Sequence, residues 1–152
     1  MKRIVILRGL PGAGKTRYID DLVEKGEQIV VCSADHFFER RVGGRSEYLF
    51  DPKLLPEAHS VCFSAFLDAL LAGYPLIVVD NTNIRRWEYT NYDRAARLAG
   101  YEVEIVEVRV DTFDDVRVCA SRGTHGVPKD IIAKMAVDFE PDTRAKIVQI
   151  KR

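Results

Sequence analysis

The sequence predicts an α/β fold in which a parallel sheet of about five strands is covered by helices on both faces. Short, continuous apolar runs rich in branched residues are typical of strands buried on both faces. These runs alternate with segments whose apolar residues recur at helical spacing. A glycine-rich loop, GLPGAGKT, follows the first run and precedes the first helical pattern. Strand and helix alternating in this way predict parallel strands joined by crossover helices.

Five segments fit the strand pattern. The run from Ile4 to Leu7 and the run from Leu76 to Val79 are continuous and rich in branched residues. The fourth segment carries charges at alternate positions near its start, which indicates that one of its faces is less buried. In chain order, the predicted strands are residues 4–7, 28–33, 76–79, 102–110 and 146–150.

Helical patterns fill the intervals between these strands. In the longest of them, apolar residues lie on one face from Ala58 to Ala69, and Gly73 and Pro75 end the helix. Pro128 suits the first turn of the last helix, where its missing N–H costs nothing. In chain order, the predicted helices are residues 18–23, 53–71, 85–99, 112–121 and 128–138.

Length and charge restrict the class of protein. The 152 residues suit one domain, spanning residues 1–152, with a real core. Lys and Arg number 23, and Asp and Glu number 23, so the formal net charge is zero. A protein that coats long nucleic acid needs a basic excess, which this chain lacks. A protein that grips one chain end with a few arginines is still compatible with this balance.

The cysteines and the apolar segments indicate the compartment. Cys32, Cys62 and Cys119 are far apart and lack metal-ligand spacing, so we expect buried thiols rather than a disulfide framework or a zinc site. The N-terminal apolar run is too short for a signal peptide, and no segment approaches membrane-spanning length. We therefore expect a cytoplasmic protein with no membrane partner. The oligomeric state is not predicted.

The GLPGAGKT stretch, residues 9–16, fits the P-loop (Walker A) pattern. Its glycines allow a tight turn whose backbone N–H groups form an anion nest, and the following helix adds its positive end. Lys15 reaches the β- and γ-phosphates of ATP, and the Thr16 hydroxyl is suited to Mg²⁺. The alternative is a plain Gly-Pro turn, which the strand–loop–helix order disfavours. The predicted nucleotide-binding residues in this loop are Gly9, Pro11, Gly12, Ala13, Gly14, Lys15 and Thr16.

Two carboxylates, Asp35 and Asp80, follow the second and third predicted strands. Ligands of parallel sheets bind outside the carboxyl ends of the strands, so both acids are expected beside the P-loop. One is expected to face Mg²⁺, directly or through water, and the other to accept a proton from an attacking hydroxyl. We assign the metal to Thr16 and Asp80, although the main acidic ligand stays open between Asp35 and Asp80. The alternative for each acid is a helix N-cap or a turn residue.

The segment after Asp35, residues 37–45, suits an acceptor pocket. It combines aromatic rings that can stack a base or sugar, arginines that can hold a phosphate, and glycines that allow mobility. A solvated surface loop with ordinary charges is the alternative.

A second glycine-rich segment, RGTHGVP, precedes the last predicted helix and suits a lid over the nucleotide. Arg122 on such a lid stabilises charge on the transferred phosphoryl group, and closure excludes water. The alternative is a Gly-Pro connector with an exposed arginine. His125, taken alone, fits a turn residue better than a catalyst.

Several blocks together resemble the P-loop kinases related to bacteriophage polynucleotide 5′-kinase: GLPGAGKT, SADHFF, YLFDPKLLPEAHSVC, VVDNTNIRRWE, GYEVEIVEV and RGTHGVPKDIIAKM. The chain is most similar to the branch with DNTN and HGVP motifs, which includes kinase-like domains of eukaryotic ubiquitin-ligase-binding proteins. The resemblance covers nearly the whole chain. Many families share the P-loop block, whereas the DNTN and RGTHGVP blocks are more specific. The resemblance implies a P-loop kinase fold with a small lid.

The resemblance also implies residue roles. Lys15 and Thr16 carry the P-loop roles, Asp35 matches the general base, and Arg122 matches a lid arginine on the donor phosphates. The segment 80–83 matches the region that positions acceptor and magnesium.

The departures from the phage pattern concern mainly the acceptor side. Asn81 replaces an aspartate, and Phe38 stands where an arginine grips the acceptor's 3′-phosphate. Val118 stands near the place of a second lid arginine. The donor side of the pattern is therefore carried over more completely than the acceptor side.

Together these observations predict an ATP-dependent kinase that transfers the γ-phosphoryl group to a 5′-hydroxyl of DNA or RNA, with Lys15, Asp35 and Arg122 as catalytic residues. One alternative is a kinase for a small molecule such as a nucleoside, sugar or drug, and another is an ATP-binding switch without transfer. The choice between DNA and RNA, and the pathway, stay open. The predicted substrate-binding residues are Asp35, Phe38, Arg40, Arg41, Arg45, Asn81, Thr82 and Asn83.

Overall fold

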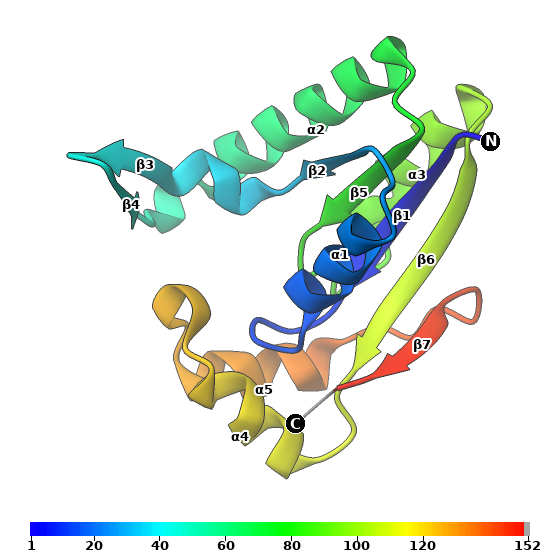
Figure 1. Cartoon of the computed structure of the whole chain (residues 1–152). Coiled ribbons are helices and arrows are strands. Elements are labelled where there is room, and N and C mark those ends of the chain that lie inside the picture. The colour runs from blue at the N-terminus through cyan, green and yellow to red at the C-terminus, as the bar shows by residue number, and fades with distance from the viewer. Residues whose placement is uncertain (151–152) are drawn as a thin grey trace.

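A five-stranded parallel sheet forms the centre of the computed structural model, which describes residues 1–150 (Figure 1). Its strand order is β2-β5-β1-β6-β7, so β1 lies in the middle. Ile6 of β1 pairs with Val79 on one side and with Ile105 on the other. The predicted parallel sheet is confirmed. Its strands are β1 (Arg3–Arg8), β2 (Ile29–Cys32), β5 (Leu76–Asp80), β6 (Glu102–Arg109) and β7 (Lys146–Gln149).

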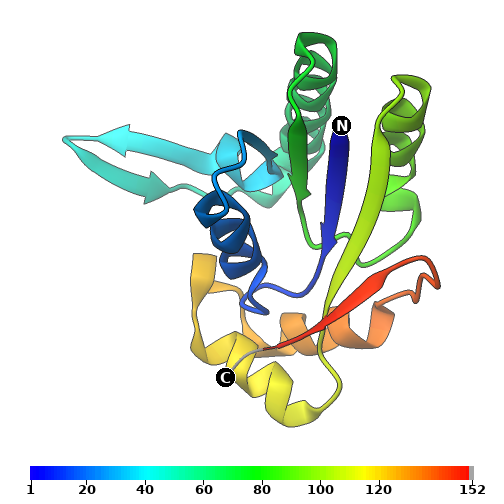
Figure 2. The same ribbon diagram turned by 45° about the vertical axis from the view of Figure 1, so that its right-hand side comes forward.

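Helices cover both faces of this sheet, as predicted (Figure 2). Alternate strand residues point to opposite faces, so Val5 and Val78 pack with helix α1 (Lys15–Glu24) on one side. Ile4 and Ile77 pack with α2 (Leu55–Ala72) and α3 (Trp87–Leu98) on the other side. The two resulting apolar layers fix β1 and β5 in the sheet. The P-loop follows the carboxyl end of β1, and Asp80 lies at the carboxyl end of β5.

Two further helices, α4 (Phe113–Ser121) and α5 (Lys129–Asp138), pack against each other near the carboxyl end of β6 (Figure 1). Their apolar residues Val116, Cys119 and Ile132 form a separate core cluster with Leu10 and Val108. A short 3-10 turn, η3 (Thr124–Gly126), joins them. The segment predicted as a lid, residues 122–128, forms the connection between these two helices.

The segment after Asp35 is an antiparallel hairpin, which corrects the expectation of a mobile loop over residues 37–45. A 3-10 helix, η1 (Ala34–Phe38), leads into β3 (Glu39–Val42), and β4 (Arg45–Tyr48) returns from it. The turn consists of Gly43 and Gly44, with φ of 57° and 81°. Two successive positive φ angles are typical of the tight hairpin turn that matches strand twist. The hairpin projects from the body of the protein (Figure 2).

A correction concerns the longest apolar helix. The 3-10 turn η2 (Pro52–Leu54) and α2 together form a stretch of 21 residues that is long and apolar enough to cross a membrane by length and composition. The expectation that no segment approaches that length is therefore wrong. Ala58, Cys62 and Phe66 of α2 pack into the core, and one such helix within residues 1–150 is weak evidence for a membrane span.

The three cysteines are free and buried, as predicted. Burial raises the pKa of Cys32 to about 12 and also raises the pKa of Cys62 and Cys119. These thiols therefore behave as small apolar side chains of the core.

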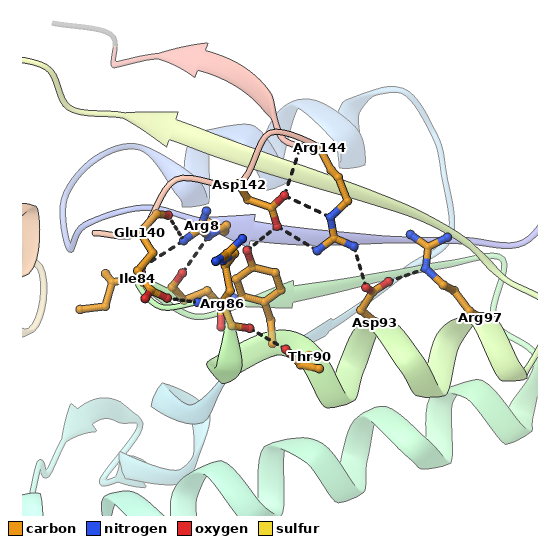
Figure 3. A network of polar contacts seen from close by, with 11 residues as sticks. Arg8, Ile84, Arg86, Thr90, Asp93, Arg97, Glu140, Asp142 and Arg144 are labelled. Carbon is orange, nitrogen blue, oxygen red and sulfur yellow. Dashed lines mark hydrogen bonds and ion pairs between the residues drawn. The ribbon is translucent and has the colours of Figure 1, made fainter. Parts of the chain in front are cut away.

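A buried polar network fixes the end of β1 (Figure 3). The fully buried Arg8 donates from Nε to the Asn83 carbonyl at 2.8 Å, and from Nη2 to the carbonyls of Ile84 at 3.1 Å and Glu140 at 2.6 Å. Its guanidinium carbon lies 4.9 Å from the centre of the Tyr89 ring and 4.6 Å from that of Phe139. Arg8 thereby ties the loop after β5 to the segment after α5.

Candidate nucleotide-binding site

The P-loop connects β1 to α1 and lies directly on α4. Gly12 and Gly14 have φ of 78° and 114°, which only glycine adopts readily. A Cβ atom on Gly12 would collide with the carbonyl oxygen of Cys119 in α4. The loop therefore needs glycine at this position both for its conformation and for its packing. The N-terminus of α1 follows at once, so its positive end is directed to any anion held by the loop.

Lys15 is held by its own loop. Its Nζ donates to the carbonyls of Gly9 at 2.7 Å and Leu10 at 3.1 Å. Burial lowers the pKa of Lys15, while the negative charges of Asp80 and Asp35 act in the opposite direction. A partly buried ammonium with two carbonyl partners can exchange them for phosphate oxygens, which are stronger acceptors. Thr16, one residue on, is exposed in the first turn of α1.

The two strand-end acids have different surroundings. Asp80 is the last residue of β5, and burial raises its pKa while the charge of Lys15 lowers it. Asp35 lies in η1, with Oδ1 accepting a hydrogen bond from the Tyr48 hydroxyl at 2.9 Å. Neither acid caps a helix, since Ser33 caps η1 and Asp80 belongs to a strand. Both carboxylates are therefore available to the site.

The side chains of the DNTN motif mainly hold the sheet edge together. Asn81 accepts from the Ala34 N–H at 2.9 Å and donates to Cys62 Sγ at 3.7 Å, so it joins the ends of β5 and β2. Asn83 is 2% exposed, has a φ of 48° and donates to the Leu7 carbonyl at 2.7 Å. The Thr82 carbonyl accepts from the Gly9 N–H at 3.0 Å. These bonds set the position of Asp80 relative to the P-loop.

Arg122 lies over the P-loop from the end of α4. Its Nη1 donates to the Gly12 carbonyl at 2.9 Å. A cation at this place adds to the charge of Lys15 where donor phosphates would bind.

One cavity of about 1140 Å³ brings most of the predicted residues together. Gly9 lies behind Lys15 and does not line it, and Phe38 and Asn83 are both 2% exposed and lie in the interior. Arg40, whose Nη1 donates to the Phe37 carbonyl, lies on the exposed hairpin with Arg41 and Arg45, also outside the cavity lining. The predicted residues that line the cavity are Pro11, Gly12, Ala13, Gly14, Lys15, Thr16, Asp35, Asp80, Asn81, Thr82 and Arg122.

The sequence analysis missed two cavity-lining aromatic residues, Tyr48 and Phe50. His125 lies in the turn η3, as expected, and also lines the cavity. The rings of Tyr48 and His125 stack with centroids 4.0 Å apart and planes 11° apart. The Gly43-Gly44 pair was the sequence feature from which the position of Tyr48 could have been predicted. A two-residue turn there sets the register that pairs Tyr48 with Glu39, next to η1 and Asp35.

Comparisons with known proteins bear on the family and the fold of this chain. Human NEDD4-binding protein 2 is 32% identical over 137 residues, which cover 90% of this chain and 8% of that protein. The chain therefore spans less than a tenth of this relative's length.

Among solved structures, the Pnkp1/Rnl/Hen1 RNA repair complex contains a chain that matches with a TM-score of 0.68 and 18% identity, covering 95% of this chain and 49% of that one. A gluconokinase from Sinorhizobium meliloti 1021 matches with a TM-score of 0.64 and 14% identity, covering 99% and 83%. At such identities the likeness shows the fold alone. A family model described as an AAA domain matches residues 4–141, and the chain therefore belongs to this AAA domain family, with the fold of the P-loop kinases.

Proposed function

We propose that this chain is an ATP-dependent kinase that transfers the γ-phosphoryl group of ATP to the 5′-hydroxyl end of DNA or RNA. The observation that carries the proposal is the single cavity that joins the P-loop to Asp35. Its volume of about 1140 Å³ exceeds the range of about 300 to 1,000 Å³ that is usual for one small ligand. A donor nucleotide and the end of an acceptor therefore both have room in it.

The donor end of this cavity suits a triphosphate. The P-loop backbone, the N-terminus of α1, Lys15 and Arg122 all present positive charge or N–H groups to the same place. The residues present also fit Mg²⁺, because the exposed Thr16 hydroxyl and the Asp80 carboxylate line the same cavity. When bound, Mg²⁺ would neutralise negative charge on the donor phosphates.

The acceptor end of the cavity suits a hydroxyl group. In the proposed step, Asp35 takes the proton of the acceptor hydroxyl, whose oxygen forms a bond to the γ-phosphorus. The bond between that phosphorus and the β–γ bridging oxygen breaks, and ADP leaves with the electron pair. Lys15 and Arg122 stabilise the charge that develops on the transferred group.

The hairpin supports a nucleic-acid acceptor. Arg40, Arg41 and Arg45 lie on an exposed arm whose base is next to Asp35. We propose that these arginines bind backbone phosphates further along the acceptor strand, while its 5′ end enters the cavity.

A small-molecule acceptor is the second candidate. The structural likeness to a gluconokinase, the zero net charge, and the burial of Phe38, which stands where the phage family has an arginine, favour it. A nucleic-acid acceptor would contact the hairpin arginines, whereas a small acceptor held inside the cavity would not. This difference allows the two candidates to be separated.

The test uses γ-labelled ATP, Mg²⁺ and short 5′-hydroxyl strands of DNA and RNA, with gluconate and nucleosides in parallel reactions. We expect label on the 5′ end of a strand, and a loss of at least about 100-fold with Asp35→Asn, since general bases contribute that much. ATP binding, measured by calorimetry, should persist in Asp35→Asn and fall in Lys15→Ala. Replacing Arg40, Arg41 and Arg45 together by Gln should raise the KM for the strand and leave the KM for ATP unchanged.

Three outcomes would contradict the proposal in different ways. Label on a small molecule but on no strand would establish the second candidate. ATP binding without transfer to any acceptor would indicate a nucleotide-binding switch. Full transfer by Asp35→Asn would remove Asp35 from the role of base while leaving the kinase itself intact.

A further inference from the structure

Three groups from separate parts of the chain meet at the acceptor end of the cavity. Asp35 comes from η1, Tyr48 from the end of β4, and His125 from the turn between α4 and α5. The Tyr48 hydroxyl donates to Asp35 Oδ1 at 2.9 Å, and His125 Nδ1 lies 3.5 Å from Asp35 Oδ2. The His125 ring also stacks on the Tyr48 ring, with centroids 4.0 Å apart. Each group thus contacts the other two.

The Tyr48 ring is held in place by neighbouring aromatic residues at the base of the hairpin. Its centroid lies 5.9 Å from that of the buried Phe38 and 6.1 Å from that of Phe50, whose plane is parallel within 4°. Burial and the bond to Asp35 raise the pKa of Tyr48, so its hydroxyl keeps its proton and stays a donor. The direction in which Asp35 presents its oxygens is therefore set by Tyr48.

The turn that carries His125 is built to reach across the cavity. Gly123, His125 and Gly126 all have positive φ, of 60°, 61° and 66°. Left-handed backbone is less favourable for histidine than for glycine, although histidine adopts it more often than most residues, and contacts of the side chain offset its cost. The stack on Tyr48 and the contact with Asp35 are such contacts. His125 is therefore the point at which the lid touches the acceptor side.

We propose that Tyr48 is a positioning residue for Asp35 and that His125 latches the lid onto this pair. Tyr48 occupies Oδ1, which leaves Oδ2 as the oxygen that takes the proton of the acceptor hydroxyl. The His125 ring lies beside Oδ2 and holds the lid there, so that the acceptor hydroxyl meets Oδ2 with the lid in place. Closure of the lid over the nucleotide and orientation of the base are coupled in this way. The inference rests on the proposed function, because it concerns the same carboxylate.

The contact itself is tested without any reaction, by NMR of the free protein. We expect the ring protons of His125 to be shifted by the ring current of Tyr48. Tyr48→Phe should keep this shift, because it keeps the ring, and Tyr48→Leu should abolish it. An unchanged His125 spectrum in Tyr48→Leu would overturn the latch, whatever reaction the protein catalyses.

The positioning role is tested by kinetics on the acceptor that the first assay identifies. Tyr48→Phe should lower kcat by about tenfold and leave the KM for ATP unchanged, since loss of one hydrogen bond to a charged group is of that order. His125→Ala should raise the KM for the acceptor several-fold and leave the KM for ATP nearly unchanged, because the lid is no longer held at the acceptor side. Tyr101→Phe is the matched control, because that hydroxyl donates to the Tyr74 carbonyl at 2.7 Å, outside the cavity lining.

The double variant Tyr48→Phe/His125→Ala separates coupling from two independent effects. We expect its loss in kcat/KM to be smaller than the product of the single losses, because both residues act on one carboxylate. Multiplicative losses, or an unchanged kcat in Tyr48→Phe, would overturn the proposal. Absence of transfer by the unsubstituted protein would instead refute the proposed function, and the NMR shift would then decide the latch alone.

Discussion

Two polar clusters contain similar kinds of residue and differ in how their polar atoms are used. The network of Figure 3 joins Arg8, Asp142 and Arg144, and the cavity holds Lys15, Asp80 and Asp35. In the network, Asp142 accepts bonds from the Tyr89 hydroxyl at 2.7 Å and from three nitrogens of Arg144 at 2.9 to 3.1 Å. These bonds hold the pKa of Asp142 well below its usual range.

The cavity residues differ from Asp142 in this respect, although burial also lowers the pKa of Arg8 in the network. Burial raises the pKa of Asp80 and lowers the pKa of Lys15, so in both residues the charged form is disfavoured by its surroundings. A satisfied network stabilises the fold, whereas charges kept in an unfavourable setting are typical of sites that await a ligand. Two polar atoms near the network are unsatisfied, because Arg8 Nη1 and Glu107 Oε1 are buried without a hydrogen-bond partner in residues 1–150.

The largest expected effect is on stability, from removal of the charge of Arg8. Arg8→Met leaves three carbonyls without their donor, and we expect the free energy of unfolding to fall by about 3 to 5 kcal/mol. Asp35→Asn, in which the replaced side chain is 49% exposed, should change it by less than about 1 kcal/mol. Urea unfolding followed by circular dichroism measures both. Equal losses in the two variants would remove the distinction between the clusters.

The sequence was sufficient to predict the parallel sheet and the order of its main elements along the chain, and it placed the P-loop and the two strand-end acids at one edge, where they line one cavity. Continuous apolar runs determine buried strands, and the position of ligands in parallel sheets then follows. It was not sufficient for the hairpin, because β3 is exposed along its whole length and carries no alternation of apolar and polar residues. Its glycine pair was the remaining local signal.

The contacts of single side chains could be predicted least. Arg8 binds carbonyls 75 to 132 residues away in the sequence, and backbone acceptors leave no trace in residue type. Tyr48 and His125 meet because the hairpin and the turn between α4 and α5 lie against each other at the cavity. Such pairs depend on the arrangement of elements in space, which local patterns do not contain.

A smaller effect is expected from pH, which should change the free energy of unfolding in opposite directions through the two clusters. The folded pKa of Asp142 is depressed, so its contribution to stability is present above the unfolded value of about 3.9 and is lost as the pH falls below it. The folded pKa of Asp80 is raised, so stability should fall as the pH rises from about 4 through that folded value.

Urea unfolding at a series of pH values measures both contributions. Asp142→Asn should lower stability at neutral pH by roughly 2 kcal/mol and flatten its acid dependence. Asp80→Asn should raise stability at neutral pH, because it removes a carboxylate that burial disfavours. A loss of stability at neutral pH in both variants would show that the two carboxylates have the same role in the fold.

The smallest expected effect compares one hydrogen bond in each cluster. Tyr89 donates to Asp142 at 2.7 Å and Tyr48 donates to Asp35 at 2.9 Å, so replacement by Phe removes the same bond twice. Tyr89 is 1% exposed, and removal of its hydroxyl leaves the buried Asp142 carboxylate with one partner fewer. We therefore expect Tyr89→Phe to lower the free energy of unfolding by about 1 to 2 kcal/mol. Solvent reaches the half-exposed Asp35 and replaces the lost bond, so Tyr48→Phe should cost less than about 0.5 kcal/mol. Transfer should respond in the opposite order, with a loss in Tyr48→Phe and none in Tyr89→Phe. If stability and transfer changed together in both variants, Tyr48 would belong to the fold rather than to the site.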